Sequence, residues 1–247
     1  MALKILGVKI DNLNKAEVLM KAASFLSGDR QYYIVTINPE FIMAAQRDEE
    51  FKGILNKADL AIADGMGIKL AARKFGAKLK QRLAGVDLMQ ELAILAGQQN
   101  KSIFLLGAKK HGVVEQTAYR LLQAYPGLKI AGAESGYRRF WHRQLPDEKI
   151  VEMINRRRPD ILFVAFGQVK QEKWIYRNLP KLTSVKLAMG VGGSFDYISG
   201  HIRRAPPAMR RLGLEWLYRM FRQPWRLPRI ITAVISFSWA VFRFKKK

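Results

Sequence analysis

The first 190 positions alternate between short apolar runs and longer segments whose apolar residues recur with helical spacing. Between the runs lie segments of helical period, such as Asp87–Gln98 and Gly112–Ala124. This alternation predicts an α/β fold with a Rossmann-like, mostly parallel sheet and helices on both of its faces. Six runs rich in β-branched and aromatic residues are the expected strands: Tyr33–Ile37, Leu60–Ala63, Ile103–Leu106, Leu128–Ala133, Ile161–Ala165 and Val185–Met189.

Polar and glycine-rich segments stand at the ends of five of these runs. In open α/β sheets, ligands bind in a crevice outside the carboxyl ends of the strands. We therefore expect the five segments to converge on one binding crevice. They are Thr36–Glu40, Asp64–Gly67, Gly107–Lys110, Gly167–Glu172 and Gly190–Asp196.

The pattern changes near residue 200, where the alternation stops and Arg203-Arg204-Ala205-Pro206-Pro207 makes a break. A helical pattern follows, in which Leu, Met and Trp residues between 209 and 221 share one broad face. The longest charge-free apolar stretch, Ile230–Phe242, has thirteen residues, whereas a membrane-spanning helix needs ~20. The sequence thus predicts a catalytic domain over 1–200 and an amphipathic appendage over 201–247 that lies in a membrane interface.

Charge supports a membrane role for the appendage. The chain has a net charge of +23, and its last 47 residues carry twelve lysines and arginines against one acid, Glu215, interleaved with tryptophans. Such segments bind anionic lipid surfaces.

The N-terminus reads as a first strand and helix and not as a signal peptide, so we expect a peripheral protein on the cytoplasmic face. Self-association can hide apolar surface that is off the membrane, so homo-oligomers are compatible with the sequence.

Asp64 is the sharpest candidate for chemistry. It follows the apolar run Leu60–Ala63 and precedes Gly65-Met66-Gly67, so its carboxylate is expected at the sheet edge. A carboxylate there can act as general base toward a sugar hydroxyl within hydrogen-bond reach. The competing interpretation is an N-cap aspartate of the following helix, and the sequence alone leaves both open.

The sequence offers no metal or dinucleotide motif. It has no cysteine, and its three histidines are scattered without ligand spacing, so we expect neither a metal site nor a cofactor. The Gly65 loop lacks the third glycine of GxGxxG, and no P-loop occurs. A bound diphosphate would then depend on arginine, lysine and backbone N–H groups. For any single arginine, a solvated or lipid-facing charge is the competing interpretation.

Six motifs, in this order, resemble the WecB/TagA/CpsF (WecG/TagA) family of bacterial glycosyltransferases. The resemblance runs from about residue 30 to about residue 230. It implies a cytoplasmic, membrane-associated, inverting enzyme that transfers N-acetylmannosamine or a related sugar from a UDP-sugar to polyprenyl-diphosphate-linked N-acetylglucosamine, in teichoic acid-type cell-wall synthesis. The motifs are Thr36-x-Asn38-Pro39-Glu40, Asp64-Gly-x-Gly67, Arg82-x-x-Gly85-x-Asp87, Gly167-x-x-Lys170-Gln171-Glu172-x-Trp174, Gly190-Val-Gly-Gly-x-Phe195-Asp196 and Arg204-Ala-Pro206.

The resemblance also implies roles for single residues. Asp64 would be the general base that deprotonates the acceptor 4-hydroxyl, with Thr36 beside it. Substrate would be bound by Asn38, Arg82 and Gln171, and the uridine end of the donor by Val191, Gly192, Gly193 and Asp196. Catalytic arginines of the appendage, which would reach the diphosphate, correspond to Arg219, Arg226 and Arg229. The chain departs from the family at Val169, where proline is usual, at Ser199, where alanine is usual, and at Ala84 and Val86.

Other classes of protein remain as alternatives. A sequence pI near 10.4 and basic residues among aromatics also fit a nucleic-acid-binding protein. Against this, the aromatics of the appendage share a face with Leu and Met, so we expect no nucleic-acid partner. An NAD-dependent oxidoreductase is disfavoured by the incomplete glycine motif. A membrane scaffold without catalysis would leave the polar strand ends without a purpose.

Overall fold

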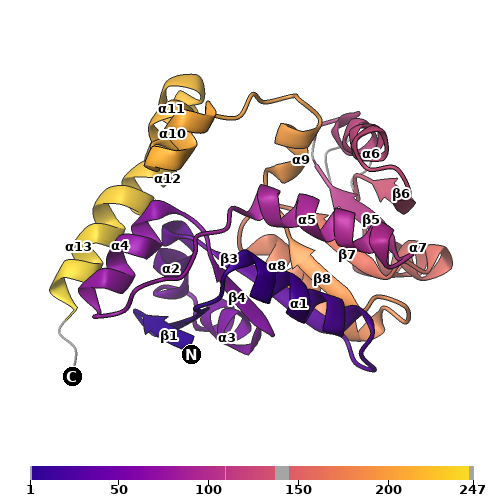
Figure 1. The fold of residues 1–247 in the computed structure, drawn as a ribbon, viewed down its shortest axis with the longest axis horizontal. Coiled ribbons are helices and arrows are strands. Elements are labelled where there is room, and N and C mark those ends of the chain that lie inside the picture. Colours follow the sequence, from indigo (N-terminus) through magenta and orange to yellow (C-terminus); the bar gives the residue numbers. More distant parts are fainter. Residues whose placement is uncertain (1, 109, 137–144, 245–247) are drawn as a thin grey trace. The chain divides into compact units, whose positions relative to one another are not determined.

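The computed structural model describes residues 2–108, 110–136 and 145–244 of the chain, which leaves Lys245–Lys247 of the appendage outside the described residues. It has the predicted alternation of strands and helices (Figure 1). The strands are β1 Ala2–Ile5, β2 Val8–Asp11, β3 Tyr32–Ile37, β4 Leu60–Ala63, β5 Ser102–Gly107, β6 Lys129–Glu134, β7 Ile161–Ala165 and β8 Leu187–Gly190. The helices up to residue 198 are α1 Lys15–Leu26, α2 Pro39–Ala45, α3 Glu49–Lys57, α4 Met66–Lys74, α5 Gly85–Gln98, α6 Val113–Ala124, α7 Asp147–Arg157, α8 Lys170–Asn178, η1 Leu179–Lys181 and α9 Ser194–Ile198.

The strands form one mostly parallel sheet in the order β1-β2-β4-β3-β8-β7-β5-β6, which confirms the predicted fold class. Parallel pairs include β3 with β8, β8 with β7, and β7 with β5. Strands β4, β7 and β8 are buried at every position. Burial along a whole strand requires cover on both faces of the sheet, which is why these runs show no polar alternation.

All six predicted strands are present. Two have the predicted bounds, and β8 begins at Leu187, two residues later than expected. The N-terminal segment, expected as a single strand, is an antiparallel hairpin of β1 and β2. Leu6 and Gly7 form its turn with φ of 48° and 80°, and two consecutive left-handed residues are what a tight two-residue hairpin requires.

The chain divides into two compact units. The first comprises Met1–Asn14, Thr36–Ala84 and Arg203–Lys247, and the second comprises Lys15–Val35 and Gly85–Ile202.

In the first unit, helices α2 and α3 begin with side-chain caps. Asn38 Oδ1 accepts from Phe41 N at 2.9 Å, and Asp48 Oδ1 accepts from Phe51 N at 2.9 Å. Such caps satisfy N–H groups that a helix start leaves unpaired.

From Arg203 on, the appendage belongs to the first unit. It contains α10 Pro207–Leu212, α11 Glu215–Arg222, η2 Pro224–Arg226, α12 Leu227–Ile231, η3 Thr232–Ser236 and α13 Phe237–Arg243. Its last helices contact α2 and α4, and α13 runs beside α4 in Figure 1. Phe237 is 2% exposed and faces Gly67, where an added Cβ would come within 3.5 Å of the Phe237 ring. Among the described helices, none is long and apolar enough to cross a membrane.

The buried face of the appendage predicts a large stability cost for Phe237→Ala. Truncating a buried phenylalanine loses its transfer free energy and leaves a cavity, so the free energy of unfolding should fall by about 3–5 kcal/mol. Phe242→Ala is the matched control on the same helix, because Phe242 is 74% exposed and its loss should cost little. Urea denaturation of both variants measures this. Equally small effects would mean that the appendage does not pack on α4 in solution.

Candidate active site

The ends of β3 and β4 bring three predicted site residues together in the first unit. Asp64 N donates to Ile37 O at 2.7 Å, which ties the residue after β4 to the last residue of β3. Thr36, 9% exposed, precedes Ile37, and Asn38 follows it as the N-cap of α2. A general-base candidate thus lies one backbone hydrogen bond from the segment that carries Thr36 and Asn38.

Asp64 is not the N-cap of the following helix. The residue before α4 is Gly65, with φ of 95°, and a glycine has no side chain that could cap the helix. The N-cap position is thus occupied by Gly65 and not by Asp64. The left-handed Gly65 turns the chain sharply after Asp64, whose side chain is half-buried at the end of a fully buried strand.

Arg82 lies beside the same strand end, on the segment that leads away from α4. Leu83 N donates to Ala63 O at 3.0 Å, which fixes this segment against the last residue of β4. The Arg82 guanidinium donates through Nη2 to Arg210 O of α10 at 3.0 Å. Arg82, expected to bind substrate, therefore also holds the backbone of the appendage in place.

One catalytic arginine expected from the appendage reaches this region. Arg229 Nε donates to Glu40 Oε2 at 2.7 Å, and the two side chains are 48% and 23% exposed. An ion pair this open to solvent contributes only about 0–1 kcal/mol, so a stronger anionic partner can displace Glu40 at little cost. The side chains of Arg219 and Arg226 lie outside the described residues.

The second unit holds the predicted uridine-binding loop after β8. Val191 N donates to Val164 O of β7 at 2.9 Å, and Gly193 is the residue before α9. Asp196 lies in the first turn of α9 and is half-buried, with its carbonyl oxygen accepting from Ile202 N at 2.9 Å. The loop is thus fixed by backbone hydrogen bonds at both of its ends.

A buried polar network lies under this loop. Gln171 and Glu172, 2% and 1% exposed, stand in the first turn of α8. Gln171 Nε2 donates to Glu172 Oε1 at 2.6 Å, while Gln171 Oε1 accepts from Gly192 N at 3.0 Å. Glu172 Oε2 accepts from Val169 N at 2.8 Å. A proline, which the family resemblance leads one to expect at 169, has no N–H for this last bond.

Burial raises the pKa of the Glu172 carboxyl from its ordinary value of 4.5 to about 7, against the opposing effect of its hydrogen bonds. The neighbouring Tyr33 hydroxyl of β3 is also buried, and burial followed by the charge of Glu172 raises its pKa. A carboxylate that is half ionised near neutral pH inside a protein core is costly, and such groups gather at functional sites.

Glu40, Glu172 and Arg210 have no role in the sequence-based site, although the first two stand inside its motifs. Glu40 reads as an ordinary first-turn acid of a helix, and Glu172 as a surface residue of an amphipathic one. Nothing in the sequence signals that Glu172 turns inward or that Arg229, 189 positions away, pairs with Glu40.

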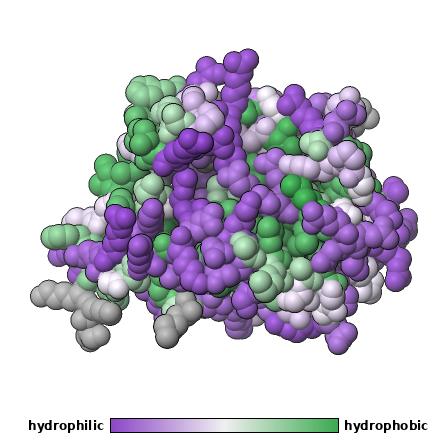
Figure 2. Space-filling view, in the orientation of Figure 1, coloured by the Kyte–Doolittle hydropathy of each residue, from purple (hydrophilic) through white to green (hydrophobic). Residues whose placement is uncertain are grey.

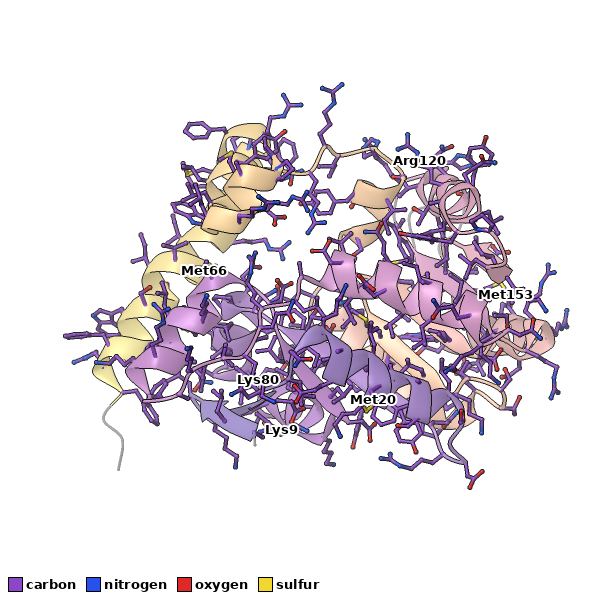
Figure 3. The ribbon with its side chains drawn as sticks, in the orientation of Figure 1. Lys9, Met20, Met66, Lys80, Arg120 and Met153 are labelled. Atoms are coloured by element: carbon purple, nitrogen blue, oxygen red, sulfur yellow. The ribbon has the colours of Figure 1, made fainter. Side chains whose placement is uncertain are left out.

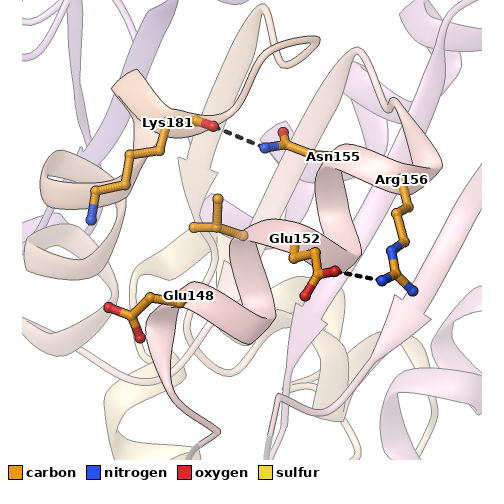
Figure 4. A pocket seen from close by; sticks show the side chains of 6 residues that line it. Glu148, Glu152, Asn155, Arg156 and Lys181 are labelled. Carbon is orange, nitrogen blue, oxygen red and sulfur yellow. Dashed lines mark hydrogen bonds and ion pairs between the residues drawn. The ribbon is translucent and has the colours of Figure 1, made fainter.

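A shallow hollow beside α7 contains none of the predicted site residues (Figure 4). Glu148, Glu152 and Asn155 of α7 line it together with Lys181 of η1. Asn155 Oδ1 accepts from Thr183 N, which precedes β8, so this end of the hollow lies near the amino end of that strand. We assign it no role. In the described parts of the chain, no cluster of three or more His, Cys, Asp and Glu side chains could hold a metal ion.

The raised pKa predicts how Glu172 affects stability. Between pH 4.5 and about 7 the folded state binds more protons at this group than the unfolded state, so its contribution is complete below pH 4.5 and is lost as the pH rises through 7. The free energy of unfolding of the wild type, relative to that of Glu172→Gln, should fall by about 3 kcal/mol as the pH rises from 4.5 through 7. Chemical denaturation at several pH values measures the difference, and a difference that stays constant would refute the shift.

Comparison with known proteins identifies the family. The model of the glycosyl transferase WecG/TagA/CpsF family matches residues 3–247. An N-acetylglucosaminyldiphosphoundecaprenol N-acetyl-beta-D-mannosaminyltransferase of Bacillus subtilis (strain 168) is 38% identical over 227 residues, covering 90% of this chain and 81% of the relative. The protein of the same name from Staphylococcus aureus (strain MW2) is 34% identical over 245 residues, covering 98% and 93%. The chain therefore belongs to the WecG/TagA/CpsF family of glycosyltransferases.

Proposed function

We propose that this enzyme transfers N-acetylmannosamine, or a closely related sugar, from a UDP-sugar to the 4-hydroxyl of polyprenyl-diphosphate-linked N-acetylglucosamine. The names of the relatives supply the transferred sugar and the acceptor. The observation that carries the proposal for this chain is the position of Asp64, half-buried at the end of β4 beside Thr36 and Asn38. The product would enter teichoic acid-type cell-wall synthesis.

The proposed reaction is a single inverting displacement. The Asp64 carboxylate accepts the proton of the acceptor 4-hydroxyl as that oxygen forms a bond to the anomeric carbon of the donor. The bond from this carbon to the β-phosphate oxygen breaks on the opposite face of the sugar, and UDP leaves with the bonding electrons. The 4-hydroxyl is only weakly acidic, so proton removal belongs to the same step as attack.

Negative charge gathers on the leaving UDP, and we assign its stabilisation to arginines without a metal ion. Arg229 approaches the Asn38-Pro39-Glu40 segment by pairing with Glu40. A diphosphate can replace this carboxylate because it carries more negative charge and also binds the planar guanidinium through two oxygens. Arg219 and Arg226 share this proposed role by their spacing. Arg82, Gln171 and the Val191–Asp196 loop would bind the substrates.

We also propose that residues 201–247 form a membrane-targeting appendage that holds the enzyme on the cytoplasmic face. Hydrophobic surface gathers over these helices in Figure 2. The most exposed large side chains include Phe221, Trp225, Trp239 and Phe242, at 74%, 73%, 60% and 74%. Aromatic side chains of this kind settle between lipid headgroups and acyl chains while basic residues attract anionic lipid.

The catalytic part contributes α4 to the same proposed membrane surface. Lys74 Nζ lies 4.7 Å from the ring centroid of Phe242, and Phe75 meets Phe244 edge to face at 5.7 Å. Leu70, one turn earlier on α4, is 57% exposed. Basic residues continue after this helix to Lys78 and Lys80, the second of which is labelled in Figure 3. Side chains from α4 and α13 thus form one basic, aromatic surface.

The function is tested by incubating the enzyme with candidate UDP-sugars and a short-chain polyprenyl-diphosphate N-acetylglucosamine. Mass analysis of the product should show one added N-acetylhexosamine, and linkage analysis should show a bond to the 4-oxygen with inverted anomeric configuration. Full activity in excess chelator is expected. Retained configuration would exclude the single displacement.

Asp64→Asn should lower kcat by about 10²- to 10⁴-fold, because an amide cannot accept the hydroxyl proton. Asp59→Asn is the matched control, since Asp59 precedes the same strand at its opposite end and should leave turnover within a fewfold of the wild type. Thermal denaturation checks that both variants fold. Near-normal turnover by Asp64→Asn would remove Asp64 from the mechanism.

Trp225→Ser combined with Phe242→Ser should weaken binding to vesicles containing phosphatidylglycerol by at least tenfold. The reason is that the loss of each ring removes about 2 kcal/mol of binding free energy from apolar burial. Tyr119→Ser is the control, because Tyr119 is 58% exposed but lies in the second unit. Vesicle sedimentation at low and high salt measures binding. Unchanged affinity, or tighter binding to RNA than to vesicles, would contradict the membrane surface.

A further inference from the structure

Three hydrogen bonds in the second unit form a continuous relay from the start of α8 to the loop after β8. Val169 N donates to Glu172 Oε2, Gln171 Nε2 donates to Glu172 Oε1, and Gly192 N donates to Gln171 Oε1. We propose that Glu172 is a positioning residue for donor binding, which sets the orientation of the Gln171 amide and through it the conformation of the Gly190–Gly193 loop. This inference rests on the proposed donor role of that loop.

The direction of each bond depends on the charge of Glu172. A carboxylate only accepts, so both of its partners must be donors. The Gln171 amide therefore turns its nitrogen toward Glu172 and its oxygen toward Gly192. Gly192 N–H, in a loop residue with φ of 53°, thus gains its acceptor only because the Gln171 nitrogen already donates to Glu172.

Protonation of Glu172 would reverse this arrangement. The Val169 N–H belongs to the backbone and cannot turn away from Oε2, so the proton goes to Oε1. An Oε1–H group needs an acceptor, and the Gln171 amide can supply one by rotating its oxygen toward Glu172. Its Nε2 then faces Gly192 N–H, two donors meet, and the loop loses its hydrogen bond.

The backbone of Gly190 lies directly against this hydrogen-bond relay. A Cβ at Gly190 would lie 2.5 Å from Glu172 Oε1 and 2.6 Å from Gln171 Nε2, so the last residue of β8 is a glycine pressed against the relay. Tyr33 of β3 is the titratable group that faces Glu172 in the described structure, and its raised pKa keeps it neutral throughout the range in which Glu172 titrates.

Glu172→Gln tests the relay because it fixes the protonated pattern at every pH. The oxygen of the substituted amide would face Val169 N–H, so its nitrogen would donate toward Gln171 and force the same amide reversal. Glu152→Gln is the matched control, since Glu152 lies on the exposed surface of α7. Losing one hydrogen bond to the loop should weaken UDP binding by about three- to tenfold.

The first readout is the ¹H–¹⁵N resonance of Gly192 between pH 5.5 and 8.5. In the wild type and in Glu152→Gln, it should titrate with a midpoint near 7, and in Glu172→Gln it should stay at the low-pH position. A Gly192 resonance that does not titrate in the wild type, or that titrates equally in Glu172→Gln, would overturn the proposal. The wild-type titration needs no variant, so poor folding of Glu172→Gln leaves the test intact.

The second readout is the ratio of UDP dissociation constants for Glu172→Gln and wild type, measured by calorimetry. This ratio cancels the titration of UDP itself. It should be about three- to tenfold at pH 8.5 and approach one at pH 5.5, and a ratio independent of pH would contradict a positioning role. If UDP binds neither protein at any pH, the proposed donor is wrong, while the Gly192 titration still decides whether the relay exists.

Discussion

Burial of the strands on both faces is the constraint on which the rest of the structure depends. Strands β4, β7 and β8 have no exposed side where polar side chains can stand, so polar chemistry is confined to the points where the strands end. Asp64 follows β4 and Gly190–Gly193 follows β8 for this reason. The same constraint explains why glycines and left-handed residues gather there, because a chain that leaves a buried strand must turn at once.

A second consequence of this burial is that Glu172 lowers the stability of the folded protein. Its carboxyl sits in the core beside β8 and its pKa rises to about 7, so the ionised form lowers stability near neutral pH. An apolar residue of similar volume would avoid this cost. Yet an apolar residue cannot accept hydrogen bonds from Val169 and Gln171, and Gly192 would then face an amide free to turn either way. Glu172 thus lowers the stability of the fold near neutral pH but gives the loop one defined conformation.

Much of the fold follows from sequence because a strand buried on both faces consists of consecutive apolar residues, as in Leu60–Ala63 and Ile161–Ala165, whose bounds are reproduced without error. The sequence does not predict the hairpin of β1 and β2, because its turn, Leu6-Gly7, lies inside an apolar run that is too short for its pattern to show two strands. The site residues that the sequence predicts are those that a motif marks, and their roles stay predictions. Contacts between distant segments, such as Arg229 with Glu40 or Arg82 with Arg210, depend on tertiary packing that no local pattern encodes.

The last helix of the appendage has two faces. One packs beside the candidate active site, and the other is exposed and forms part of the proposed membrane surface. One face, with Phe237, packs on α2 and α4, next to the segment that carries Asn38 and Glu40. The other exposes Trp239 and Phe242. Both faces belong to the same helix, α13, so the rings of the proposed membrane surface and the buried ring of Phe237 are parts of one rigid element. Because Arg229 lies on the same appendage, the proposed membrane binding would hold this candidate catalytic arginine near the surface where the lipid-linked acceptor is expected.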